Sequence, residues 1–165
     1  MSKKTHKPRQ HRSSKLDNLL RREEEEFLSG ARIAHLATAD AKGRPSVVPV
    51  VFILEGGEIY VPIDGKPKKN PRNLRRLRNI QENPNIAFLV DYYDEDWSKL
   101  AFIHIRGKAR ILNTQGATSA EIDLLGRCTR GFRKKYVQYG NVSLGEPEMV
   151  MIQITPESFS PWGVT

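Results

Sequence analysis

The sequence has a single cysteine, Cys128, in 165 residues. One thiol cannot form an internal disulfide or a cysteine-based metal cage. The longest apolar run, residues 47–54, has eight residues and includes a proline, whereas a membrane-spanning helix needs roughly 20. The N-terminus also lacks the apolar segment of a secretory signal. These absences predict a cytoplasmic protein.

Acidic residues are missing from two stretches, residues 1–15 and 66–78, which together hold thirteen of the 27 lysines and arginines. The rest of the chain has 14 basic and 19 acidic residues, a net charge of −5, although the whole chain carries +8. The basic character is therefore local. This pattern favours an anion site over a surface that is basic throughout.

The first basic stretch, at the N-terminus, is not expected to fold. Residues 1–14 have too few apolar side chains to offset the entropy of ordering. We therefore expect a disordered basic tail over residues 1–14. Residues 15–165 are long enough to form one domain with a buried core.

The pattern of apolar residues predicts a mainly β, α+β domain. Helices are expected at 15–29, 71–82 and 117–139, and the glutamates 23–26 are expected on a solvated face of the first. Strands are expected at 32–38, 46–54, 58–62, 86–92, 101–112 and 148–154, and a non-strand tail follows. Helices in the connections and the absence of βαβ alternation predict a six-stranded antiparallel split β-barrel.

The most informative segment is the second basic stretch. Lys66, Lys68 and Lys69 lie in a loop with Pro67 and Pro71, directly before the expected helix at 71–82. Unpaired amides and the dipole of a helix N-terminus attract anions, and lysines add mobile positive charge. The loop therefore predicts a phosphate site, with solvated charge or nucleic-acid contact as the alternative.

Several short motifs recur in a shared order along the chain. They are residues 33–38 (IAHLAT), 43–45 (GRP), 47–52 (VVPVVF), 64–68 (DGKPK), 74–77 (LRRL), 79–80 (NI), 83–84 (NP) and 89–92 (LVDY). Over about residues 27–162 the chain resembles the split-barrel flavin and deazaflavin proteins related to pyridoxamine 5′-phosphate oxidase. Residues 94–97 (DEDW) are similar to the acidic-aromatic loop of the subgroup that uses coenzyme F420.

The resemblance implies a homodimer with the cofactor in a groove between the subunits. Pro49, Val50 and Val51 would lie beneath the tricyclic ring, with Thr38 beside them. Ile63, Lys66, Lys68 and Lys69 would bind the phosphate. Trp97 and Trp162, from this chain or its partner, would lie near the ring or the substrate.

The implied activity is that of an oxidoreductase in which the cofactor carries out hydride transfer with a small organic substrate. Coenzyme F420 and FMN share a ring and a phosphate, but F420 adds a polyglutamate tail. The bases at 66–78, with Arg130 and residues 133–135, suit that tail and favour F420, with FMN as the alternative. We nominate no catalytic acid or base and no metal ligand. His35 reads as a core or rim residue, and Cys128 beside Arg127 and Arg130 suggests a lowered thiol pKa without a partner base.

Two rival functions remain at this stage. A nucleic-acid-binding module would use the basic tail and basic helix, but few aromatic residues accompany them for base stacking. A cofactor-free or haem-binding member of the same fold is the other, since fold does not fix function.

Overall fold

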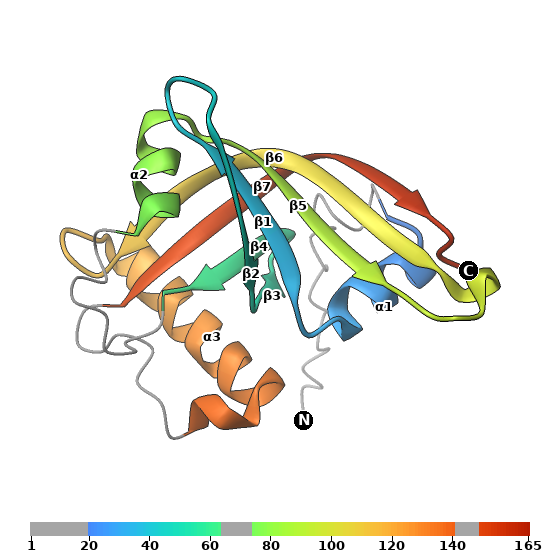
Figure 1. The fold of residues 1–165 in the computed structure, drawn as a ribbon. Helices are drawn as coiled ribbons and strands as arrows, with labels where there is room; N and C mark the ends of the chain where they lie inside the picture. The colour runs from blue at the N-terminus through green and yellow to red at the C-terminus, as the bar shows by residue number, and fades with distance from the viewer. Residues whose placement is uncertain (1–19, 64–73, 141–148) are drawn as a thin grey trace, which may run out of the picture.

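The structure, a computed structural model, describes residues 20–63, 74–140 and 149–165 (Figure 1). The described helices are α1 (Arg22–Gly30), α2 (Arg75–Glu82) and α3 (Ser119–Lys135), with short 3₁₀ helices η2 (Trp97–Lys99) and η3 (Val137–Gly140). The described strands are β1 (Ala34–Ala39), β2 (Pro45–Val50), β3 (Ile53–Glu55), β4 (Glu58–Pro62), β5 (Asn85–Tyr92), β6 (Ala101–Asn113) and β7 (Val150–Trp162). The mainly β, α+β class is confirmed.

The strands form one antiparallel sheet in the order β2-β1-β5-β6-β7-β4-β3. The sheet is strongly curved (Figure 1). Its two edge strands, β2 and β3, follow one another in the chain and are joined by Val51 and Phe52. The single strand predicted over 46–54 is therefore two strands, so the sheet has seven strands and not six. Between β2 and β3 the described chain forms no ladder, and barrel closure is not observed.

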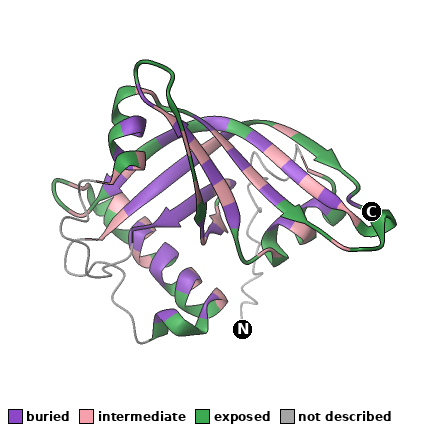
Figure 2. Ribbon diagram, in the orientation of Figure 1, coloured by how far each residue is buried: buried purple, intermediate pink, exposed green. Residues whose placement is uncertain are grey.

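Buried and exposed residues alternate along the strands (Figure 2). The inward residues of the sheet, among them Leu36, Phe88 and Ile103, form the main hydrophobic core. A second cluster lies between α3 and the β3-β4-β7 side of the sheet and includes Phe132, Tyr136 and Met151. The alternation predicted for strand 101–112 is confirmed, since Ile103, Ile105 and Ala109 are buried whereas Arg106, Lys108 and Arg110 are exposed.

Strand β7 differs most from its prediction, because it continues through residues 155–162 to Trp162. The pairing of β7 with β6 shifts between Arg106 and Gly107, which face Ser158 and Pro156, so β7 carries one extra residue there. Such a β-bulge accommodates a proline within a strand. The bulge also brings the β7 backbone onto Gly107, where an added Cβ would lie 2.3 Å from the Thr155 carbonyl oxygen.

The three helices lie where they are predicted, but two are shorter: α1 begins at Arg22, although the prediction includes the described residues 20 and 21, and α3 ends at Lys135 instead of residue 139. Helix α1 ends at Gly30, and α2 buries Leu77 and Ile80; residues 15–19 and 64–73 lie outside the described residues. One of the glutamates expected on a solvated face, Glu24, is buried and caps the helix by accepting hydrogen bonds from Arg21 N and Nε. Among the described helices, none is both long and apolar enough to cross a bilayer.

The β1–β2 turn is held by the buried carboxylate of Asp40. Its Oδ1 accepts hydrogen bonds from the Lys42 and Arg44 amides at 3.0 Å, and its Oδ2 accepts one from Arg44 Nε at 2.7 Å. The backbone hydrogen bond from Arg44 is the main interaction that lowers the pKa of Asp40, against the opposing effect of burial. A folded-state pKa below the unfolded value stabilises the fold above the unfolded pKa.

We therefore expect Asp40→Asn to destabilise the protein at pH 7, and the gap from wild type to narrow as the pH falls below about 4. Urea unfolding at pH 7 and pH 3 measures both stabilities. Asp123→Asn, which changes an exposed carboxylate on α3, is the matched control and should leave the unfolding midpoint unchanged. A gap for Asp40→Asn that is equal at both pH values would contradict this role.

Candidate functional site

The outward side chains of β2 form an exposed and uncharged surface. Pro45, Val47 and Pro49 point outward, and Val47 is 61% exposed. On the adjacent strand β1, Ala37 pairs with Val47 and His35 pairs with Pro49. Small apolar groups on a regular strand suit the face of an aromatic ring system, which fits the ring predicted to lie over residues 49–51.

Other residues of the predicted cofactor site lie on the inner side of the sheet. Thr38 is 4% exposed, and its hydroxyl accepts a hydrogen bond from Asn79 Nδ2 of α2 at 2.9 Å. Val50 and Ile63 are buried members of the main core. Of the predicted residues, Pro49 is therefore the one whose side chain is exposed on β2, while Thr38, Val50 and Ile63 support the strands from within.

The two tryptophans of the prediction lie at the far end of the same sheet. Trp162 ends β7, is 52% exposed and stacks on Phe102 with a ring separation of 5.6 Å. Trp97, in η2, is 75% exposed. Four strand spacings separate β2 from β7, on the order of 19 Å. Trp162 and Pro49 are therefore not on neighbouring strands of one chain.

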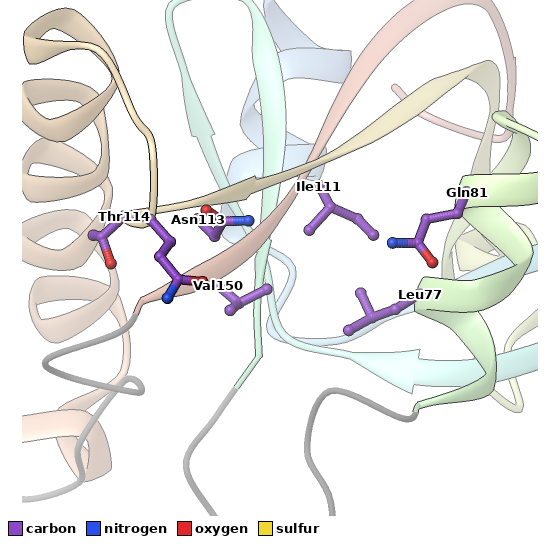
Figure 3. A pocket seen from close by; sticks show the side chains of 7 residues that line it. Leu77, Gln81, Ile111, Asn113, Thr114 and Val150 are labelled. Atoms are coloured by element: carbon purple, nitrogen blue, oxygen red, sulfur yellow. The ribbon is translucent and has the colours of Figure 1, made fainter.

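The lysines of the predicted phosphate loop, Lys66, Lys68 and Lys69, lie outside the described residues. A pocket of about 180 Å³ lies between α2 and the adjoining ends of β6 and β7 (Figure 3). Leu77 and Gln81 of α2 point into it from one side, and Ile111 and Val150 from the other. The Val150 carbonyl also accepts a hydrogen bond from the Ile63 amide at 2.9 Å, so the pocket adjoins the last described residue before the predicted phosphate loop.

The link between β2 and β3 is held by Tyr136, which the sequence did not mark. The Tyr136 hydroxyl accepts a hydrogen bond from the Phe52 amide at 3.1 Å. As a donor it lies 2.8 Å from the Phe52 carbonyl oxygen and 3.0 Å from that of Arg32. Phe52 lies outside both strands, so this hydroxyl supplies the partner that its peptide groups lack in the sheet. Tyr136 thereby fixes the strand on which Pro49 lies.

Near these elements one histidine approaches a carboxylate. His35 Nδ1 lies 3.2 Å from Asp91 Oδ1, but the geometry is not that of a hydrogen bond. The expectation of a lowered pKa for Cys128 is wrong: the thiol is buried, and burial raises its pKa to about 12. Arg127 lowers the pKa of this thiol, but it pairs with Glu55 at 2.9 Å, and the Glu55 charge raises the pKa by more. Among the described residues, no three His, Cys, Asp or Glu side chains converge as metal ligands would.

Comparisons with known proteins identify the family of the chain and other proteins with a similar fold. The family model described as pyridoxamine 5′-phosphate oxidase matches residues 20–163. No curated protein matches the chain. Among solved structures, HutZ, a heme storage protein from Vibrio cholerae, is similar with a TM-score of 0.63 and 16% identity, over 87% of this chain and 94% of that one.

Two further solved structures share the fold. A putative pyridoxamine 5′-phosphate oxidase from Listeria innocua has a TM-score of 0.59 and 19% identity, over 84% of this chain and 94% of that one. A FAD-binding protein from Mesorhizobium loti has a TM-score of 0.61 and 19% identity, over 83% of this chain and 89% of that one. At these identities the likeness concerns the fold alone.

Proposed function

Because the chain belongs to the pyridoxamine 5′-phosphate oxidase family, we propose that it is an oxidoreductase that binds a flavin-type cofactor and acts on a small organic substrate. We propose coenzyme F420 as the cofactor, with FMN as the alternative. The observation that carries the proposal is the family match over residues 20–163 together with the exposed, uncharged outer surface of β2.

In this proposal the protein positions the cofactor and excludes water. The ring lies over the end of β2, where Pro49 faces outward, Val50 faces the core and Val51 begins the link to β3. Thr38 and Ile63 support these residues from the core side. Lys66, Lys68 and Lys69 bind the phosphate. When bound, the cofactor supplies the hydride chemistry. The choice of F420 rests on the bases at residues 66–78 together with those near the end of α3, which suit a polyanionic tail; the latter are Arg130, Arg133, Lys134 and Lys135.

We further propose that the protein acts as a homodimer through the outer face of the sheet. Large exposed apolar side chains occur on β2, on β7 and on the β5–β6 connection: Val47, Trp162, Tyr93 and Trp97. Exposed apolar surface of this kind marks an interaction site. In one chain, β2 and β7 are not neighbouring strands. In the dimer, a partner chain would bring its own Trp97 and Trp162 toward a ring held on β2.

The test is an equilibrium titration of purified apoprotein with F420, FMN and haem in parallel, followed by fluorescence or absorbance. We expect micromolar binding of F420 and weaker binding of FMN. Tighter binding of FMN than of F420 would identify FMN as the cofactor. Tight haem binding without flavin binding, or tight DNA binding without either, would contradict the proposed function.

Variants of the phosphate loop sharpen the test. Lys66→Ala and Lys68→Ala should each weaken cofactor binding by about 1.5–3 kcal/mol, because a charge-assisted contact to phosphate is lost. Lys42→Ala, which removes an exposed lysine from the β1–β2 turn, is the matched control and should leave the affinity unchanged. Equal affinities for all three variants would count against the loop as the phosphate site.

A further inference from the structure

Two basic side chains from distant parts of the chain meet where the end of α3 lies beside the start of β1 and the β2–β3 link (Figure 1). The half-buried Lys135 places its Nζ 4.2 Å from the centre of the Phe52 ring and 5.5 Å from that of Tyr136. The Arg32 guanidinium lies 4.6 Å from the Tyr136 ring centre and donates a hydrogen bond to the Lys135 carbonyl. The aromatic rings thus hold both cations in one small region.

These two cations have no acidic partner among the described residues, because no carboxylate there lies within ion-pair distance of Lys135 or Arg32. Other bases on α3 or packed against it do pair, as Arg110 does with Glu121 at the start of the helix and Arg127 with Glu55. The Lys135 ammonium therefore contacts aromatic ring faces. These faces stabilise a partly buried positive charge less well than water or a carboxylate would.

Some charges around Lys135 stabilise its ammonium form and others destabilise it. The carbonyl end of α3 favours an ammonium ion, but Arg32 occupies the Lys135 carbonyl, and Arg133 and Lys134 of the same turn add like charge. Partial burial has the largest effect and Arg32 the next, and together they lower the pKa of Lys135 to about 8. A substantial fraction of the amine is then neutral at physiological pH.

We propose that Lys135 is a nucleophilic amine that accepts acyl groups from small anionic acyl donors, of which acyl phosphates are the class that fits, with Arg32 binding the phosphate. The neutral Lys135 nitrogen attacks the acyl carbon, a C–N bond forms, and the bond from the acyl carbon to the phosphate oxygen breaks. The nitrogen loses its proton to solvent, and inorganic phosphate leaves with the electron pair. The products are an Nζ-acyl lysine and phosphate.

Arg32 gives the site its preference for an anion. Its side chain is exposed, and within the part of the chain that the structure describes one of its five N–H donors is engaged, with the Lys135 carbonyl. The remaining donors form a planar fork that matches phosphate oxygens. The same guanidinium therefore keeps part of the neighbouring amine neutral and binds the leaving group.

The experiment is acetylation of the full chain by acetyl phosphate at pH 7, with the modified lysines located by mass spectrometry. Cleavage after Phe132 and Tyr136 releases one peptide that carries both Lys135 and the exposed Lys134, so Lys134 is an internal control. We expect Lys135 to react roughly tenfold faster than Lys134, since its larger neutral fraction outweighs the lower nucleophilicity of a weaker base. The rate at Lys135 should level off above about pH 8.

Arg32→Gln separates anion binding from general reactivity. With acetyl phosphate, the variant should acetylate Lys135 at least about fivefold more slowly than wild type, whereas with the neutral donor acetic anhydride the loss should be smaller. Equal rates at Lys134 and Lys135 in the wild type would overturn the proposal, and so would an equal loss with both donors in Arg32→Gln. The inference does not depend on cofactor binding, so failure of either proposal leaves the other standing.

Discussion

Replacing Gly107 by alanine is expected to lower the free energy of unfolding by about 3 kcal/mol, the largest effect we predict for a change of one methyl group. The new Cβ would lie 2.3 Å from the Thr155 carbonyl oxygen and 3.1 Å from the Pro156 Cα. Both are backbone atoms of β7 at the bulge opposite Gly107. Because the clashing atoms belong to the backbone, no flexible side chain can move aside. The clash can be removed only by a shift of the β6–β7 pairing.

The same substitution at Gly126 of α3 provides the matched control. An added Cβ there would meet only Arg130 Nη1, at an ordinary contact distance of 3.7 Å. Within a helix, alanine is favoured over glycine by about 1 kcal/mol, so Gly126→Ala should stabilise the protein slightly. Urea unfolding at one fixed protein concentration measures both variants. If Gly107→Ala unfolds at the wild-type midpoint, the close approach of β7 is not present in solution.

Replacing Tyr136 by phenylalanine is expected to cost about 2 kcal/mol of stability. The ring would remain packed against Phe132, at a centroid distance of 6.1 Å, but the hydroxyl would be lost. The Phe52 amide and the carbonyls of Phe52 and Arg32 would then be left without this partner in a region where Tyr136 is only 1% exposed. Unsatisfied buried peptide groups cost more than the net value of a hydrogen bond.

Tyr93→Phe removes a hydroxyl from a ring that is 65% exposed, and it should change stability by less than about 0.5 kcal/mol. Thermal and urea unfolding of the two variants therefore separate the contacts of Tyr136 from the general effect of losing a phenol oxygen. The Tyr136 variant should also bind cofactor more weakly than wild type, since it frees the link that follows Pro49. A stability change as small as that of Tyr93→Phe would show that the hydroxyl does not hold the β2–β3 link.

The elements whose signals are local could be predicted from the sequence. The hairpin at residues 55–57 follows from Gly56 and Gly57, which both take positive φ values, a conformation that glycine adopts at little cost. The strand at 101–113 follows from its alternation of buried and more exposed residues, which is regular over residues 101–110. Pro49 was likewise placed correctly on a strand, although the sequence did not show which neighbouring predicted residues would face inward.

Contacts between distant segments could not be predicted in this way. Tyr136 is 84 residues from Phe52 along the chain, and a tyrosine near the end of a helix carries no local sign of such a partner. The continuation of β7 through Pro156 and Pro161 was missed for a related reason. Prolines normally end a strand, and only the pairing with β6 and the space above Gly107 permit the bulge.

The sequence by itself determined the type and approximate place of most elements, the local concentration of positive charge and the resemblance to a flavin-binding family, because these depend on residues close together in the chain. The tertiary structure decided the break of one strand at residues 51–52, the inward direction of Thr38 and the meeting of Arg32 with Lys135. Each of these features depends on contacts between residues far apart in the chain. Such contacts form only when the sheet curves and α3 packs against it.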